Sequence, residues 1–152
     1  MRRKSLVNDA CPIARTLDVI GDWWSLLIVR EAMMGTRRFS EFQKHLGVAK
    51  NILSARLKTL VAQGIFELKD SAEGGAYQDY VLTAKGRGLF PVLVALRQWG
   101  EEFSFAQGET YAKLLDRQTR RPLQKLQIRA FDGRILNQAD TVVVPAAAGE
   151  PL

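Results

Sequence analysis

The stretch SEFQKHLGVAKNILSARLKTLVAQG, residues 40–64, contains two helical patterns separated only by Gly47 and Val48. In the first pattern, Ser40 and Gln43 have the spacing of a capping box, so a helix is predicted to start at this serine. The second pattern repeats leucine at helical spacing and ends before a glycine in the C-terminal capping position. Two short helices joined this closely predict a helix-turn-helix.

The second of these helices, expected from residue 49 or 50 to residue 63, has an apolar and a polar face. The side chains expected to point inward are Leu53, Leu57, Leu60 and Val61. The polar face carries Lys50, Asn51, Ser54, Ala55 and Lys58. Because an amide can donate and accept at a base edge, Asn51 is the candidate base contact, and Lys50 and Lys58 are candidate phosphate contacts. The alternative is a solvated polar face without a partner.

Further basic residues flank the motif. Arg37 and Arg38 precede its first helix and are predicted to approach the phosphate backbone. The alternative for Arg38 is a pair with Glu41 or a role in stiffening the segment that joins the wing. Arg56 has a similar alternative, an inward turn toward an acidic residue. Lys69 is the candidate for a phosphate or minor-groove contact beside the wing.

The patterns around the motif predict further helices and a hairpin. The helices are expected over residues 12–20, 23–34 and 84–105. The last of them is expected to bend, if anywhere, at Pro91. Trp23 and Trp24 are interpreted as core residues of the almost wholly apolar second helix. Alternating apolar residues on both sides of the segment Glu73-Gly74-Gly75-Ala76 predict a hairpin, the wing.

The predicted fold class is therefore mainly α with a small amount of β, a winged helix-turn-helix with a long C-terminal helix and a small β appendage. Residues 1–108 are expected to form the DNA-binding and dimerisation domain, and residues 109–145 the β appendage. Strands are predicted at 126–131 and 141–144, with a turn at Asp132 and Gly133. Residues 146–152 are expected to be a disordered tail.

Charge is concentrated in the first half of the chain. The 152 residues have a net charge of +6, and residues 1–69 carry 12 basic and 6 acidic side chains. Residues 70–112 carry 3 basic and 6 acidic side chains, so the wing region is acidic. Double-stranded DNA is therefore the expected partner, and the first half is where its phosphates are predicted to dock.

The chain lacks the residues that several other classes of function require. With one cysteine, Cys11, and one histidine, His45, the chain offers no internal disulfide and no metal centre made only of protein ligands. These two residues also make an unpromising nucleophile and base, so we expect no enzyme activity and no cofactor. No signal peptide or membrane span is predicted, which favours the cytoplasm. The competing hypothesis is a winged-helix module that binds a protein rather than specific DNA.

Five separated strings match one known family in order and spacing: CPI (11–13), IGDWWSLLI (20–28), RFSEF (38–42), LSARLK (53–58) and LTAKG (82–86). They resemble the HxlR family of winged-helix regulators, which is related to the MarR type. The resemblance covers about residues 10–105 and implies a homodimeric, DNA-binding transcription regulator. Similar proteins usually have serine or threonine where Ala49 stands, so the recognition helix lacks its usual N-cap.

The resemblance also implies a dimer interface formed by the helices at 12–20 and 84–105. The candidate interface residues are Ile13, Leu17, Leu89, Leu93, Leu96 and Trp99. For Leu93, Leu96 and Trp99, packing within one chain is the alternative.

Cys11 is the candidate thiol sensor, since some similar proteins use such a cysteine as a switch. It lies at a predicted helix start, where the helix dipole and nearby basic residues, Arg15 and those at 2–4, favour the thiolate. The alternative is a small buried packing residue. An oxidant or small-molecule effector is thus expected, of unidentified nature.

Overall fold

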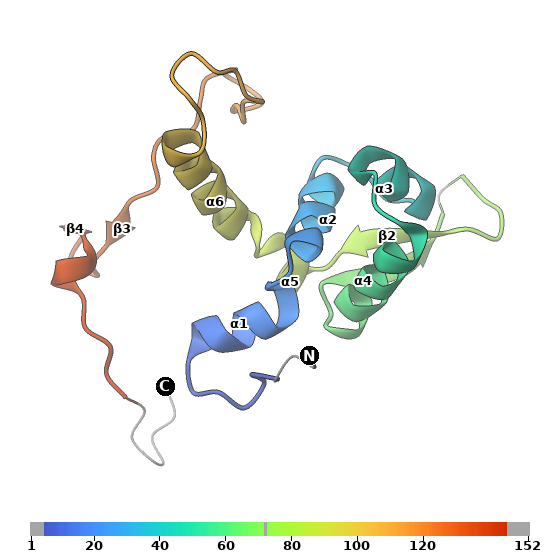
Figure 1. The fold of residues 1–152 in the computed structure, drawn as a ribbon, viewed down its shortest axis with the longest axis horizontal. Coiled ribbons are helices and arrows are strands. Elements are labelled where there is room, and N and C mark those ends of the chain that lie inside the picture. The colour runs from blue at the N-terminus through green and yellow to red at the C-terminus, as the bar shows by residue number, and fades with distance from the viewer. Residues whose placement is uncertain (1–4, 72, 146–152) are drawn as a thin grey trace. The chain divides into compact units, whose positions relative to one another are not determined.

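The computed structural model of the chain describes residues 5–71 and 73–145, which fall into two units that divide between Leu93 and Val94 (Figure 1). The helices are α1 (Pro12–Ile20), α2 (Trp23–Met33), α3 (Phe39–Leu46), α4 (Lys50–Ala62), α5 (Ala84–Arg87) and α6 (Phe90–Phe103). The strands are β1 (Phe66–Asp70), β2 (Gln78–Leu82), β3 (Ile128–Arg129) and β4 (Ile135–Leu136), and a 3₁₀ turn spans Gln138–Asp140.

The core of the first unit forms around α2, which contacts α1, α3, α4 and β2. Asp22 caps its first turn by accepting a hydrogen bond from the Ser25 backbone N–H at 3.0 Å. Ile28 and Val29 are fully buried against side chains of the helix-turn-helix and the hairpin. Figure 1 shows α2 alongside α3 and α4, so the helix predicted to be surrounded by others does hold the motif in place.

The wing is the antiparallel pair β1–β2, with Phe66 opposite Leu82 in its register. Both of these side chains are buried, whereas the far end of the hairpin lies away from the helices in Figure 1. Gly74 and Gly75 form the turn with φ of 76° and 98°, the left-handed region that favours glycine. The predicted hairpin is therefore confirmed at its predicted place.

The single long helix predicted over 84–105 is wrong, because the structure has α5 and α6 with Gly88 and Leu89 between them. Pro91 explains the break. In a continuous helix its ring would clash with the carbonyl of Arg87, one turn earlier, and would remove a hydrogen bond. In the observed structure Pro91 lies in the first turn of α6, where no N–H is needed.

Two further expectations for the first unit need correction. Helix α3 starts at Phe39 rather than Ser40, because the carboxylate of Glu41 accepts the N–H groups of Arg38 and Arg37 and so caps the helix earlier. Trp23 is 76% exposed, so it is not a core residue of the single chain, although its edge contacts the half-buried ring of Trp24.

The second unit has little core of its own. Among its described residues only Val94 is buried. Of the strand predicted at 126–131 only β3 forms, and it pairs with β4, which was not predicted, around the predicted turn, where Gly133 has φ of 89°. The strand predicted at 141–144 is wrong, since no neighbouring strand pairs with this valine-rich segment. The predicted domain division at residue 108 stays a prediction, and the predicted disordered tail, 146–152, lies outside the described residues.

Candidate nucleic-acid interface

Helix α4 presents a polar face to solvent. Its buried face is fixed by Leu53, Leu57 and Leu60, each 0% exposed. The exposed face carries Lys50, Asn51, Ser54 and Lys58. Within residues 5–71 and 73–145, none of these four side chains makes a hydrogen bond or an ion pair. They are therefore available to an external partner, as a recognition helix requires.

The turn before α4 sets its start without a side-chain cap. Gly47 ends α3 in the left-handed region at φ 61°, and Val48, only 5% exposed, anchors the turn in the core. Ala49 occupies the N-cap position and makes no side-chain hydrogen bond. Ala49, which stands where similar proteins have serine or threonine, therefore provides no side-chain acceptor for the first N–H groups of α4.

Arg38, a predicted phosphate contact, is engaged by the wing. Its Nη2 donates to Glu73 Oε2 at 2.5 Å and to Ser71 Oγ at 3.1 Å, and its Nε lies 3.8 Å from Asp79 Oδ1. The hydrogen bond and the charge of Glu73 raise the pKa of the Arg38 guanidinium. This arrangement matches the alternative in which Arg38 stiffens the connection to the wing.

The contacts of Arg38 with Glu73, Ser71 and Asp79, together called the Arg38 clamp, were not predicted from the sequence. The signal that could have found them is the acidity of the wing, which contrasts with the basic first half of the chain. A second link reinforces the clamp, since the Tyr80 backbone N–H of β2 donates to the Arg37 carbonyl at 2.9 Å. The wing and the start of α3 are therefore joined by side-chain and backbone contacts.

The other basic residues considered as phosphate contacts differ in whether an acidic residue of the chain already pairs with them. The Arg37 side chain is exposed and has no partner among the residues that the structure describes, as the phosphate hypothesis requires. Lys69 forms an exposed ion pair with Glu67 at 3.0 Å, a contact that is weak enough to exchange for a phosphate. Arg56 lies 3.3 Å from Asp22, the N-cap of α2, which matches its inward-turned alternative.

The candidate dimer residues fall into two groups. Ile13, Leu17, Leu96 and Trp99 are 70%, 46%, 51% and 62% exposed. Leu89 and Leu93, by contrast, are partly buried and pack against the core of the first unit. Leu93 therefore packs within its own chain, as the alternative to a dimer contact expected, whereas Leu96 and Trp99 are exposed.

Cys11 is exposed and occupies the N-cap position of α1. Its backbone N–H donates to Asp9 Oδ1 at 2.8 Å, and its side chain makes no capping hydrogen bond. The basic residues at positions 2–4, invoked beside it, lie outside the described residues. The alternative, a small packing residue buried next to the dimer helix, stays a prediction, because this exposure is that of a single chain.

Two negative findings apply to the part of the chain that the structure describes. It contains no cluster of side chains suited to bind a metal ion. It also has no helix with the length and apolar character needed to cross a membrane.

Comparison with known proteins places this architecture in a family. Residues 19–107 match the family model described as HxlR-like helix-turn-helix. An HTH-type transcriptional regulator of Mycobacterium tuberculosis is 41% identical over 91 residues, which are 60% of this chain and 58% of the relative. The chain thus spans less than two thirds of the length of this relative.

Two solved structures are also similar. PA1607, described as a proposed transcription factor, has 52% identity and a TM-score of 0.89, covering 93% of this chain and 99% of the other. The redox regulator HypR in its reduced form has 31% identity and a TM-score of 0.52, covering 60% of this chain and 92% of the other. The chain belongs to the HxlR-like helix-turn-helix family, whose named relatives are transcriptional regulators and not enzymes.

Proposed function

We propose that the chain is a homodimeric transcription regulator of the cytoplasm that binds a specific double-stranded operator through α4. The observation that carries this proposal is the polar face of α4, whose four candidate contacts are exposed and unengaged while its leucines are buried. Asn51 is assigned the base contact, Ser54 a supporting contact, and Lys50, Lys58 and Arg37 the phosphates. Lys69 adds a phosphate contact when it leaves Glu67, and Arg38 positions the wing.

Replacing Asn51 by alanine is expected to reduce discrimination between the operator and single-base variants by about 1–3 kcal/mol at the contacted position, because a bidentate base contact is lost. Lys58→Ala is the matched control, since it should weaken all duplexes alike. The operator is first selected from random duplexes with the wild-type protein, and affinities are measured by fluorescence anisotropy. If both variants lose affinity equally on every duplex, Asn51 does not read a base. Failure to select any preferred duplex would favour the protein-binding module instead.

A second copy of the chain is the proposed partner of the exposed apolar side chains. Leu96 and Trp99 lie on α6 with Phe103, whose ring centroid is 5.4 Å from that of Trp99. This aromatic pair is largely exposed, as is Ile13 on α1. Burying such side chains in a symmetric interface would stabilise a dimer and pair two recognition helices with two half-sites.

Leu96→Arg is expected to yield monomers at micromolar concentration, because it places an unpaired charge in the interface at a cost of about 3–5 kcal/mol. Leu93 is unsuited to this test, since its contact with the core would confound dissociation with unfolding. Leu68→Arg, at a 43% exposed position of the wing, is the control and should remain dimeric. Light scattering measures the mass, and circular dichroism verifies that helix content is retained. A wild-type monomer would remove the dimer from the proposal.

Cys11 is the proposed redox-sensitive residue, supported by its exposure and by the similarity to the redox regulator HypR. Treatment with diamide and a small thiol is expected to form a mixed disulfide at Cys11 and to change operator affinity several-fold, while Cys11→Ser remains unchanged. Mass spectrometry of the intact protein measures the adduct and anisotropy measures the affinity. Modification of Cys11 with no change in affinity would reduce it to a reactive surface thiol without regulatory effect.

A further inference from the structure

The second unit carries a cluster of arginines in the segment that follows α6. Residues 116–121, which we call the arginine loop, have the sequence DRQTRR and contain Arg117, Arg120 and Arg121. All three arginine side chains are exposed. Asp116 is the only acidic residue of the loop, so the loop has a local excess of positive charge.

Hydrogen bonds within the arginine loop define its backbone conformation. Asp116 Oδ1 accepts the backbone N–H groups of Gln118 and Thr119, both at 2.7 Å. The Asp116 backbone N–H donates to the Arg121 carbonyl at 2.8 Å, and the residues on either side of the loop pair as an isolated β-bridge. The carboxylate of Asp116 is thus engaged by backbone, and it forms no ion pair with the loop arginines in the part of the chain that the structure describes.

Helix α6 anchors the chain on both sides of the arginine loop. Before the loop, Arg97 Nη1 donates to the Ala112 carbonyl at 2.5 Å. After the loop, the Gln98 side chain donates to the Gln124 carbonyl at 3.0 Å and accepts from the Leu126 N–H at 2.8 Å. The loop therefore starts and ends near points that are fixed on α6, which reduces the ordering cost of binding a partner.

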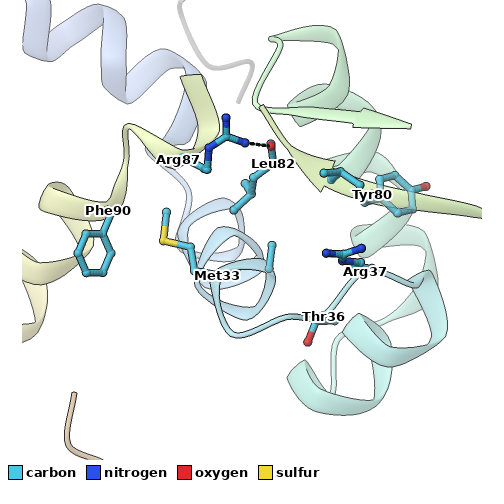
Figure 2. A pocket seen from close by; sticks show the side chains of 9 residues that line it. Met33, Thr36, Arg37, Tyr80, Leu82, Arg87 and Phe90 are labelled. Carbon is cyan, nitrogen blue, oxygen red and sulfur yellow. Dashed lines mark hydrogen bonds between the residues drawn. The ribbon is translucent and has the colours of Figure 1, made fainter. Parts of the chain in front are cut away.

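Arginines elsewhere in the chain make internal contacts that the loop arginines lack. Arg38 and Arg56 form ion pairs with carboxylates. Arg87 donates from Nη1 to the Leu82 carbonyl at 2.7 Å, as Figure 2 shows. Among the residues that the structure describes, none accepts a hydrogen bond from the side chains of the three loop arginines or pairs with their charge. Their guanidinium donors are therefore available to an external anion.

Arg120 adopts a backbone conformation that is unusual for its residue type. Its φ is 59°, and within the described ranges no other residue apart from glycine has a positive φ. Glycine or asparagine fits this left-handed region better than a long side chain does. No internal contact of the Arg120 side chain compensates for the conformation, so an external partner explains this arginine better than folding does.

These features favour a partner that carries phosphates. Guanidinium groups form paired, charge-assisted hydrogen bonds with phosphate oxygens, and a nucleic-acid backbone supplies phosphates at regular spacing. The named relatives of the chain are HTH-type transcriptional regulators, which favours double-stranded DNA as the polymer. We propose that the arginine loop binds the phosphate backbone of double-stranded DNA, outside the groove segment that α4 occupies and without regard to base sequence. This contact does not require α4 to read a base.

The arginine loop is tested with the full chain and a labelled duplex of unselected sequence, by fluorescence anisotropy at low salt. Replacing Arg117 and Arg121 together by glutamine is expected to weaken binding about tenfold, because two exposed charge pairs with phosphates are lost in each protomer. The slope of log affinity against log salt should decrease by about 2 per protomer. The matched control, Lys113→Gln with Arg134→Gln, removes the same net charge from the second unit outside the loop and should bind as the wild type does.

Arg120→Gly separates the guanidinium from the backbone conformation, because glycine adopts a φ of 59° without strain. This variant is expected to weaken binding to the same duplex several-fold, while the midpoint of thermal unfolding changes little. It also tests the arginine loop on its own, should the double variant fail to fold.

Duplex binding as tight as that of the wild type in both loop variants, or an equal loss in the control, would overturn the proposal. A wild-type protein that does not bind the duplex would overturn it as well. If the loop variants lose affinity but no preferred operator can be selected, the loop assignment stands and the proposed reading of an operator by α4 fails. If an operator is selected while the loop variants bind like the wild type, the proposed function stands, and an acidic protein surface replaces DNA as the partner that fits the loop.

Discussion

Replacing Gly86 by alanine is expected to destabilise the first unit by about 3 kcal/mol, an effect of the size seen when a packed interior is overfilled. A Cβ at this position would lie 2.3 Å from the Ile65 carbonyl oxygen and 2.9 Å from Leu82 Cδ2. The first contact is with backbone, which cannot rotate away as a flexible side chain would. Relief therefore requires moving α5 from the wing or breaking the bond between the Thr83 N–H and the same carbonyl.

The measurement is thermal unfolding followed by circular dichroism, in which the Gly86→Ala midpoint should fall by about 10 °C. Gly100→Ala is the matched control. Gly100 also lies within a helix, but a Cβ there would have nothing within 4 Å. Alanine at that position should be neutral or stabilise by up to about 1 kcal/mol, because glycine is a poor helix former. Midpoints that agree for the two variants would contradict the close approach of α5 to Ile65.

The same close approach shows what the sequence could and could not predict. Helix α4 was predictable because its leucines alternate with polar residues at helical spacing, and the hairpin because glycines mark its turn. The string LTAKG, residues 82–86, indicated the family resemblance. Its glycine, Gly86, is required because the carbonyl of Ile65, 21 positions earlier in the chain, leaves no room for a Cβ. A periodic pattern carries no information about such a contact.

Other features that the sequence did not predict also depend on contacts between residues far apart in the chain. The contact of Arg38 with Glu73 joins side chains that are 35 residues apart in the sequence. The break before α6 was closer to prediction, since Pro91 was identified and only its consequence, a stop rather than a bend, was misjudged. Trp23 was misassigned because apolar character alone does not separate a core residue from one that a partner could cover.

The affinity for the selected operator is expected to fall by about 10³-fold between 50 and 200 mM salt, because phosphate contacts release condensed counterions. Arg37, Lys50 and Lys58 have no ion-pair partner among the residues that the structure describes. In the proposed dimer they would make about six phosphate contacts, which is the lower end of the range for such a loss. Lys58→Gln should reduce the slope of log affinity against log salt by about 2, because a dimer loses two contacts.

Fluorescence anisotropy titrations at several salt concentrations measure this slope. Lys113→Gln, which changes the same charge in the second unit, is the control and should leave the slope unchanged. An equal decrease in both variants would mean that net charge rather than the face of α4 determines affinity. A slope near zero for the wild type would contradict phosphate binding altogether. Because dimer dissociation would also weaken binding, the mass is verified at each salt concentration, so that any loss of affinity is attributable to the contacts themselves.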